Sequence, residues 1–156
     1  MAQKKPIVLT GGQFEQLQSG DYIATAVIPQ LTNGNAGSLV IGTPVYASGN
    51  DSMDKAKADA VGTANVIGLV SETSISAASV GGCQMDGVLA ATTGQWDAVA
   101  GTTGGLTKDV IYYLSAATAG LLTSTAPSTT GQFVVMVGIA ISTTEMKIEI
   151  QPRIKL

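Results

Sequence analysis

Small side chains dominate this 156-residue chain and limit the folds open to it. Glycine, alanine, threonine and serine account for 69 residues, namely 19 Gly, 20 Ala, 18 Thr and 12 Ser. Most of the larger apolar residues are Val, Ile or Leu, and they occur in short runs separated by Gly, Asn, Ser and Pro. Such runs are typical of strands bounded by turns, because β-branched side chains pack well on a pleated surface. The sequence therefore predicts an all-β protein built of thin layers.

Charge and histidine content exclude several classes of function. Only 12% of the residues are charged, with 8 Lys and Arg against 11 Asp and Glu, whereas 45% are hydrophobic. This balance argues against a disordered chain, a coiled coil and a basic nucleic-acid binder. The chain has no histidine, so Ser-His-Asp and Cys-His catalysis and every His-ligated metal site are excluded. We expect no cofactor, no metal and no nucleic-acid partner.

The sequence indicates a protein that folds in the cytoplasm. Cys83 is the single cysteine, so it can form no internal disulfide and is expected to be buried as a small apolar residue. The apolar run Ile7–Leu9 is too short for a signal peptide. No segment approaches the roughly 18 continuous apolar residues of a membrane-spanning helix. We therefore expect a soluble protein without a membrane partner.

The first thirty residues differ from the rest. Within Gln13–Gln18, Phe14 and Leu17 are three positions apart and are expected to share one face of a single helical turn. Such a turn is marginal in water and needs a surface to lie on. Tyr22–Ile28 follows as a predicted strand that Pro29 stops. We interpret residues 1–30 as an extended N-terminal arm with a first strand, and residues 31–156 as a β core domain.

Seven further strands are predicted in the core domain from apolar runs and their flanking turns. They are Leu39–Ile41, Pro44–Tyr46, Val66–Val70, Cys83–Ala90, Val110–Leu114, Phe133–Ile141 and Met146–Ile150. Asp51–Ala60 shows neither period clearly, so it is either a short helix capped by Asp51 or Ser52 or an exposed insertion. We interpret it as a surface excursion.

The two halves of the core resemble each other weakly. In each half a strand is followed by an excursion and then by a strand with a central glycine, Gly68 in the first half and Gly138 in the second. Glycine inside a strand marks a bulge or a close approach of another backbone, both of which bend a sheet. The fold predicted is a small antiparallel β-barrel or sandwich with an internal two-fold repeat.

Two motifs could carry chemistry, and each has a structural interpretation. Gly101–Lys108 is rich in glycine, but Leu106 stands where a phosphate-binding loop needs a glycine, so we interpret it as a turn. Asp86, Asp97 and Asp109 each lie beside turn residues, where aspartate commonly bonds to its own backbone. Carboxylates from distant strands can still form a glycosidase pair. A small hydrolase of the cell envelope therefore remains an alternative, although we expect no enzyme.

Aromatic residues are few, and Trp96 is the only tryptophan. Tyr46, Tyr112 and Tyr113 are expected to fill the large gaps of a core made of small residues. Trp96 is the candidate exception, because Gly94, Gln95 and Asp97 place it at a predicted turn. An exposed Trp96 would suit recognition of a sugar or a protein partner.

Two parts of the sequence resemble proteins of tailed-bacteriophage virions. Gly11–Asp21 is similar to the leading segment of many such proteins. Tyr113–Thr123, Gly131–Ala140 and Gln151-Pro152 are similar to a β module of head-decoration, head-fibre and tail-fibre proteins. Because the chain is too short for a long fibre, the resemblance implies a capsid decoration, or cement, protein. Such a protein binds the outside of the expanded head and ties neighbouring capsomers together.

The resemblance also implies partners and a location. The expected partners are the major capsid protein and other copies of this chain, as a homotrimer or a dimer, on the capsid surface of the virion. Strand addition by the arm is the expected mode of capsid binding, with candidate contacts at Ile7, Val8, Leu9, Phe14 and Leu17. The alternative is a head-fibre or tail-fibre adaptor that displays a host-binding surface, in which Trp96 would take part.

Overall fold

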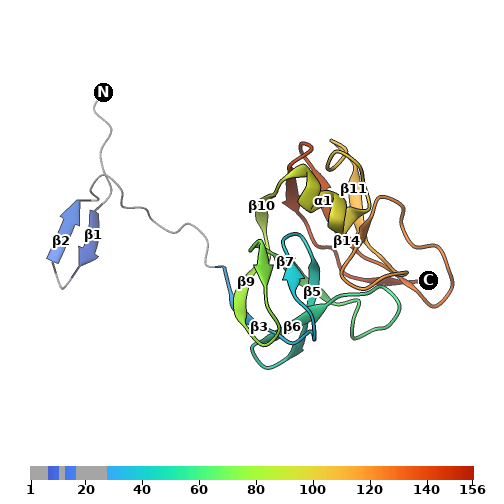
Figure 1. Ribbon diagram of the computed structural model, residues 1–156, viewed down its shortest axis with the longest axis horizontal. Helices are drawn as coiled ribbons and strands as arrows, with labels where there is room; N and C mark the ends of the chain where they lie inside the picture. The colour runs from blue at the N-terminus through green and yellow to red at the C-terminus, as the bar shows by residue number, and fades with distance from the viewer. Residues whose placement is uncertain (1–6, 11–12, 17–27) are drawn as a thin grey trace.

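The computed structural model describes residues 7–10, 13–16 and 28–156 (Figure 1). Within these residues the chain forms sixteen strands and one helix, α1 (Thr93–Ala100). The all-β prediction is therefore confirmed. Leu17 and residues 22–27 of the predicted first strand lie outside the described residues.

The arm contains a hairpin instead of a helical turn. Strands β1 (Ile7–Thr10) and β2 (Gln13–Gln16) pair antiparallel, with Leu9 opposite Phe14. The prediction of a helical turn beginning at Gln13 is therefore wrong. A single helical turn gains few backbone hydrogen bonds for the residues it orders, whereas a hairpin pairs them across two strands. The Gly11-Gly12 dipeptide between the strands is a recognised hairpin signal.

Residues 30–84 form a first unit, in which five strands close into a ring of hydrogen-bonded neighbours in the order β3-β6-β5-β7-β9. All of these pairs are antiparallel except β3–β6, which is parallel. A separate two-stranded pair, β4–β8, adds to this unit. The strands are β3 (Gln30–Asn33), β4 (Leu39–Val40), β5 (Pro44–Gly49), β6 (Ser52–Lys55), β7 (Val66–Val70), β8 (Ser74–Ile75) and β9 (Val80–Gln84).

Residues 87–155 form a second unit, in which five strands make an open antiparallel sheet in the order β10-β15-β14-β11-β12. A short pair, β13–β16, lies outside that sheet. The strands are β10 (Gly87–Ala90), β11 (Ile111–Leu114), β12 (Leu122–Thr123), β13 (Phe133–Val134), β14 (Met136–Ala140), β15 (Glu145–Ile148) and β16 (Ile154–Lys155).

The two units share one strand order. When the five sheet strands of each unit are ranked along the chain, the first pairs with the fifth, the fifth with the fourth, the fourth with the second, and the second with the third. They differ at the sheet edges. In the first unit β3 and β6 pair and close the ring, whereas their counterparts β10 and β12 do not pair. Helix α1 is inserted between β10 and β11 and lies against β12.

Both strand glycines lie at bends, where the sequence predicts bulges. Gly68 pairs with Val45 and Gly138 pairs with Tyr112, and in each case the register shifts by one residue immediately beside that pair. A Cβ atom on Gly68 would lie 2.5 Å from the carbonyl oxygen of Gln84, and one on Gly138 would lie 2.5 Å from that of Lys147. The predicted bulges and close backbone approaches are therefore both present, at equivalent places.

The two units share backbone hydrogen bonds and a core. Ala56 accepts a bond from the Gly120 amide (2.8 Å), and the Ala58 amide donates to the Ser115 carbonyl (3.0 Å). Ala58 also accepts a bond from the amide of Phe133 at 2.9 Å. Both alanines are fully buried, in the larger hydrophobic cluster that the two units build together. A second cluster, which contains Cys83, fills the ring of the first unit.

The interpretation of Asp51–Ala60 as a surface excursion is wrong. Ser52–Lys55 is strand β6 of the closed ring, and the following three residues link the two units. Two predicted strands are also each divided in two. Cys83–Ala90 is interrupted at Met85-Asp86 between β9 and β10, and Phe133–Ile141 is interrupted at Val135 between β13 and β14. An apolar run does not reveal where a chain leaves one sheet for another.

We predict that Gly68→Ala and Gly138→Ala each lower the free energy of unfolding by about 1–3 kcal/mol, because the new methyl group would displace a backbone carbonyl. Gly94→Ala is the control, since a Cβ there meets nothing within 4 Å and alanine favours a helix by about 0.5 kcal/mol. Urea denaturation monitored by circular dichroism measures the free energy of unfolding of all three variants. Equal stability of wild type and Gly138→Ala would contradict the close approach.

Candidate interaction sites

The N-terminal hairpin brings together most of the residues predicted to bind a capsid. Ile7, Val8 and Leu9 lie on β1, and Phe14 lies on β2; Leu17 is outside the described residues. Neither strand pairs with any other strand of the described chain. A two-stranded hairpin is at best marginally stable in water by itself. Both outer edges of this hairpin are thus unpaired among the residues that the structure describes.

Trp96 is not an exposed recognition residue, and that prediction is wrong. It lies in α1 with no exposed surface, and its indole Nε1 donates to the carbonyl of Thr144 at 2.9 Å. Gly42 of the first unit packs closely against the indole of Trp96. A Cβ atom on Gly42 would lie 2.9 Å from the nearest indole carbon. Trp96 thus fills the space between the units.

The ends of α1 carry a signal that the sequence analysis missed. The side chain of Thr92 accepts the amide of Gln95, and the Gln95 side chain accepts the amide of Thr92, which is a capping box. Gly101 ends the helix in the left-handed conformation, with a φ of 63°. The Thr-x-x-Gln spacing and the glycine that follows the last helical residue are typical of helix boundaries. These two signals together place Trp96 on a short helix.

The glycine-rich loop is a turn, as predicted, and the side chain of Asp97 organises it. The carboxylate of Asp97 accepts bonds from the amides of Gly105 (2.8 Å) and Gly104 (3.0 Å) and from the Thr102 hydroxyl (2.9 Å). The Gly105 bond, supported by the other two, holds the pKa of the Asp97 carboxyl below its usual range. Because these amides bind a carboxylate of the same chain, the loop does not present them to a phosphate.

Cys83 lies inside the ring of the first unit and is fully buried, as predicted. Burial raises the pKa of its thiol to about 11, so the thiol stays protonated at neutral pH. A protonated, inaccessible thiol is a poor nucleophile. Within the described residues, no three His, Cys, Asp or Glu side chains gather in a way that could hold a metal ion.

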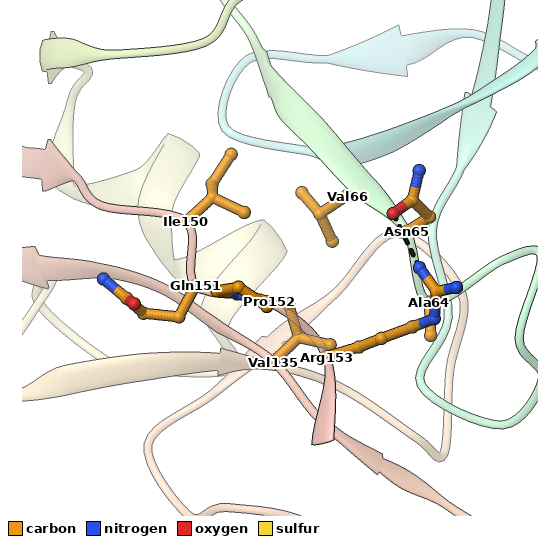
Figure 2. Close-up of a pocket in the computed structure, with 8 residues that line it drawn as sticks. All are labelled: Ala64, Asn65, Val66, Val135, Ile150, Gln151, Pro152 and Arg153. Carbon is orange, nitrogen blue, oxygen red and sulfur yellow. Dashed lines mark hydrogen bonds between the residues drawn. The ribbon is translucent and has the colours of Figure 1, made fainter. Parts of the chain in front are cut away.

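A pocket of about 450 Å³ lies between the first unit and the C-terminal segment (Figure 2). Ala64, Val66 and Val135 form a buried apolar floor. At its rim, Nη1 of Arg153 donates to Oδ1 of Asn65 at 2.8 Å. The guanidinium forms no ion pair within the described chain, so it can still donate to a carboxylate on a partner.

A second hollow, the edge groove, lies beside the outer strand of the second unit. It has a volume of about 380 Å³. Its lining consists of Ile28 and Pro29, which precede β3, and of residues 84–88, which connect β9 to β10. Three apolar side chains in it are substantially exposed: Ile28 (39%), Met85 (43%) and Val88 (48%). Sequence reasoning missed this groove because Ile28 and Val88 are 60 positions apart along the chain.

No protein-family model matches the chain, and no curated protein matches its sequence. In the described part of the chain, no helix has the length and apolar character needed to cross a membrane. The hairpin, the pocket and the edge groove are therefore the features that bear on function.

We predict that Trp96 fluorescence is blue-shifted and resists quenching by iodide, because the ring is buried. Trp96→Phe should lower the free energy of unfolding by about 1–3 kcal/mol, since it removes the indole hydrogen bond to the Thr144 carbonyl and leaves a gap between the units. Circular dichroism during urea denaturation measures the loss. Tyr113→Phe is the control, because its hydroxyl bonds to no other described residue. Free quenching of Trp96 in the folded protein would contradict the packing.

Asp97 should make stability depend on pH. A carboxyl with a lowered pKa stabilises the fold above its unfolded-state pKa of about 3.9, and this contribution is lost as pH falls through the folded-state value. Asp97→Asn should therefore lower the melting temperature at neutral pH, and the difference from wild type should shrink on acidification. Asp109→Asn is the control, because it removes the same charge from a carboxylate that only faces Lys108 at 3.8 Å. A constant difference for Asp97→Asn at every pH would contradict the role of the carboxylate.

Proposed function

We propose that the protein is a structural virion component: a capsid decoration, or cement, protein that binds the outer surface of a phage head and stabilises contacts between capsomers. The observation that carries this proposal is the β1–β2 hairpin, whose strands pair with no other strand of the described chain. Its partner is the major capsid protein. The protein acts by binding, without catalysis.

The hairpin suits this task for a physical reason. A two-stranded ribbon becomes stable when a third strand or a packed face is added to it. Pairing with the edge of a capsid subunit supplies that strand through backbone hydrogen bonds, and apolar residues such as Leu9 and Phe14 add burial and selectivity. Binding to the capsid would therefore supply the pairing and burial that an isolated two-stranded hairpin needs for stability.

The two β units also suit binding to a capsid. The two units are joined by backbone hydrogen bonds and a shared core, so they form one rigid support for further contacts. The exposed guanidinium of Arg153 and the apolar edge groove offer further contact surfaces to capsid subunits or to other copies. Many copies on one particle convert weak individual contacts into strong overall attachment. The sequence resemblance to virion proteins supports a place on the virion surface.

The head-fibre or tail-fibre adaptor receives no comparable support. In that alternative an exposed Trp96, together with the neighbouring turns, would take part in host recognition. Trp96 is fully buried and is hydrogen-bonded within the protein. It therefore has no surface with which to contact a host receptor.

Binding to expanded phage heads that lack their decoration protein tests the proposal. The variant Leu9→Ser/Phe14→Ser removes two apolar residues that face each other in the hairpin register. We expect binding to fall by at least about tenfold, which corresponds to about 1.4 kcal/mol of lost affinity. Co-sedimentation of heads with purified full-length protein measures it.

Thr10→Ser/Gln13→Ser is the matched control, since these residues are the next pair in the same hairpin. It should bind as the wild type does. If Leu9→Ser/Phe14→Ser coats heads as fully as the control, the hairpin is not the capsid-binding element. If wild-type protein does not bind heads at all, the decoration function is wrong.

A further inference from the structure

The second unit has an open sheet edge whose counterpart in the first unit is paired. In the first unit β3 pairs with β9 on one side and with β6 on the other. Its counterpart β10 pairs with β15 and has no strand on its other side in the described chain. The same strand order therefore occurs once with this edge paired and once with it open.

The hydrogen bonds of β10 show which backbone groups face the open side. The Ala91 amide donates to the Thr144 carbonyl at 2.9 Å, in register with the β10–β15 ladder. In an antiparallel pair, hydrogen-bonded and non-bonded positions alternate along the strand. Leu89 therefore faces β15 with its backbone groups, whereas Val88 and Ala90 direct their N–H and C=O groups toward the open edge.

This edge lacks the charges, prolines and bulges that keep many edge strands apart. Monomeric proteins protect such edges with charged side chains, prolines or bulges. Gly87–Ala90 contains no charge and no proline, and its pairing with β15 runs without a register shift. The edge groove beside it exposes Val88, Met85 and Ile28. The edge is therefore open, uncharged and apolar.

The uncharged edge of β10 can pair with the same edge of a second copy of the chain. A two-fold axis through Leu89 places Val88 of one copy opposite Ala90 of the other, and the reverse. Each pair then exchanges two backbone hydrogen bonds, so that all four outward groups of each strand are paired. Because the strand carries no charge, this self-pairing brings no like charges face to face.

We propose that β10 is the seam between two copies of this chain, which pair antiparallel about a two-fold axis through Leu89 and join their second units into one continuous ten-stranded sheet. The seam rests on the proposed function and deepens it, since it identifies the self-contact of the decoration protein. It leaves the hairpin free for the capsid. An isologous contact of this kind closes at two copies.

The side chain of Gln84 covers the edge in the single chain. Its Nε2 donates to the carbonyls of Asp86 (2.9 Å) and Val88 (3.1 Å). In the seam, the amide of Ala90 from the other copy takes over the Val88 carbonyl, and Gln84 keeps its bond to Asp86. The single chain thus has no bare carbonyl at this point before its partner binds.

Hydrogen exchange on the wild-type full-length protein tests the seam directly. At concentrations where the dimer forms, the amides of Val88 and Ala90 should exchange at least about tenfold more slowly than in dilute protein. The Ala91 amide is the internal control, because its bond to Thr144 lies within one chain. Sedimentation equilibrium should show a particle of twice the 15.7 kDa chain mass.

Ala90→Pro removes an outward N–H that has no partner among the described residues and places a ring at the edge, so it should yield a folded monomer. Ala90→Ser keeps the N–H and should remain a dimer. A wild-type monomer, a dimer or trimer whose Val88 and Ala90 amides exchange freely, or a folded Ala90→Pro dimer would each overturn the seam. A monomeric Ala90→Pro protein that still binds heads would support the seam and show that capsid binding does not need it. If Leu9→Ser/Phe14→Ser still binds heads, that result contradicts the role of the hairpin and not the seam.

Discussion

The backbone hydrogen bonds through Ala56–Ala58 are the contact on which the rest of the structure depends. This short segment receives bonds from the second unit at Gly120 and Phe133 and donates one to Ser115. Its alanines have no exposed surface, and larger side chains would force the two units apart. Because of this junction, two small units that would each bury little surface share one core, and a pocket forms beside their boundary.

One strand order used twice produces two different results. In the first unit the edges meet and the ring closes around Cys83 and its neighbours. In the second unit α1 is inserted ahead of β11, and Trp96 occupies the space between the units. The sheet stays open, so one side of β10 is paired with no strand of the described chain. A closed unit that gives stability and an open unit with an unpaired edge suit the proposed role of a decoration protein present in many copies.

Sequence reasoning succeeds where local chemistry decides the structure and fails where distant contacts decide it. Gly68 and Gly138 are recognisable as bends because glycine weakens a regular strand and fits best where the backbone bulges or another chain segment comes close. The glycine-rich loop after α1 is recognisable as a turn because its glycines adopt conformations that other residues avoid. Asp51–Ala60 is mispredicted because its small and charged residues have no clear period, although Ala56–Ala58 lies between two units. The turn predicted at Trp96 is wrong because Thr92 and Gln95 cap a helix there.

The amino-acid sequence by itself determined the β class, the internal repeat and the positions of its bends, because these follow from side-chain branching and from glycine at single positions. It also determined that no histidine-based site can exist. Only the tertiary structure decided which unit closes, that Trp96 is inside, and that Ile28, Met85 and Val88 meet beside an open strand. Those outcomes depend on pairings between residues far apart in the chain, and local preference does not select among such pairings.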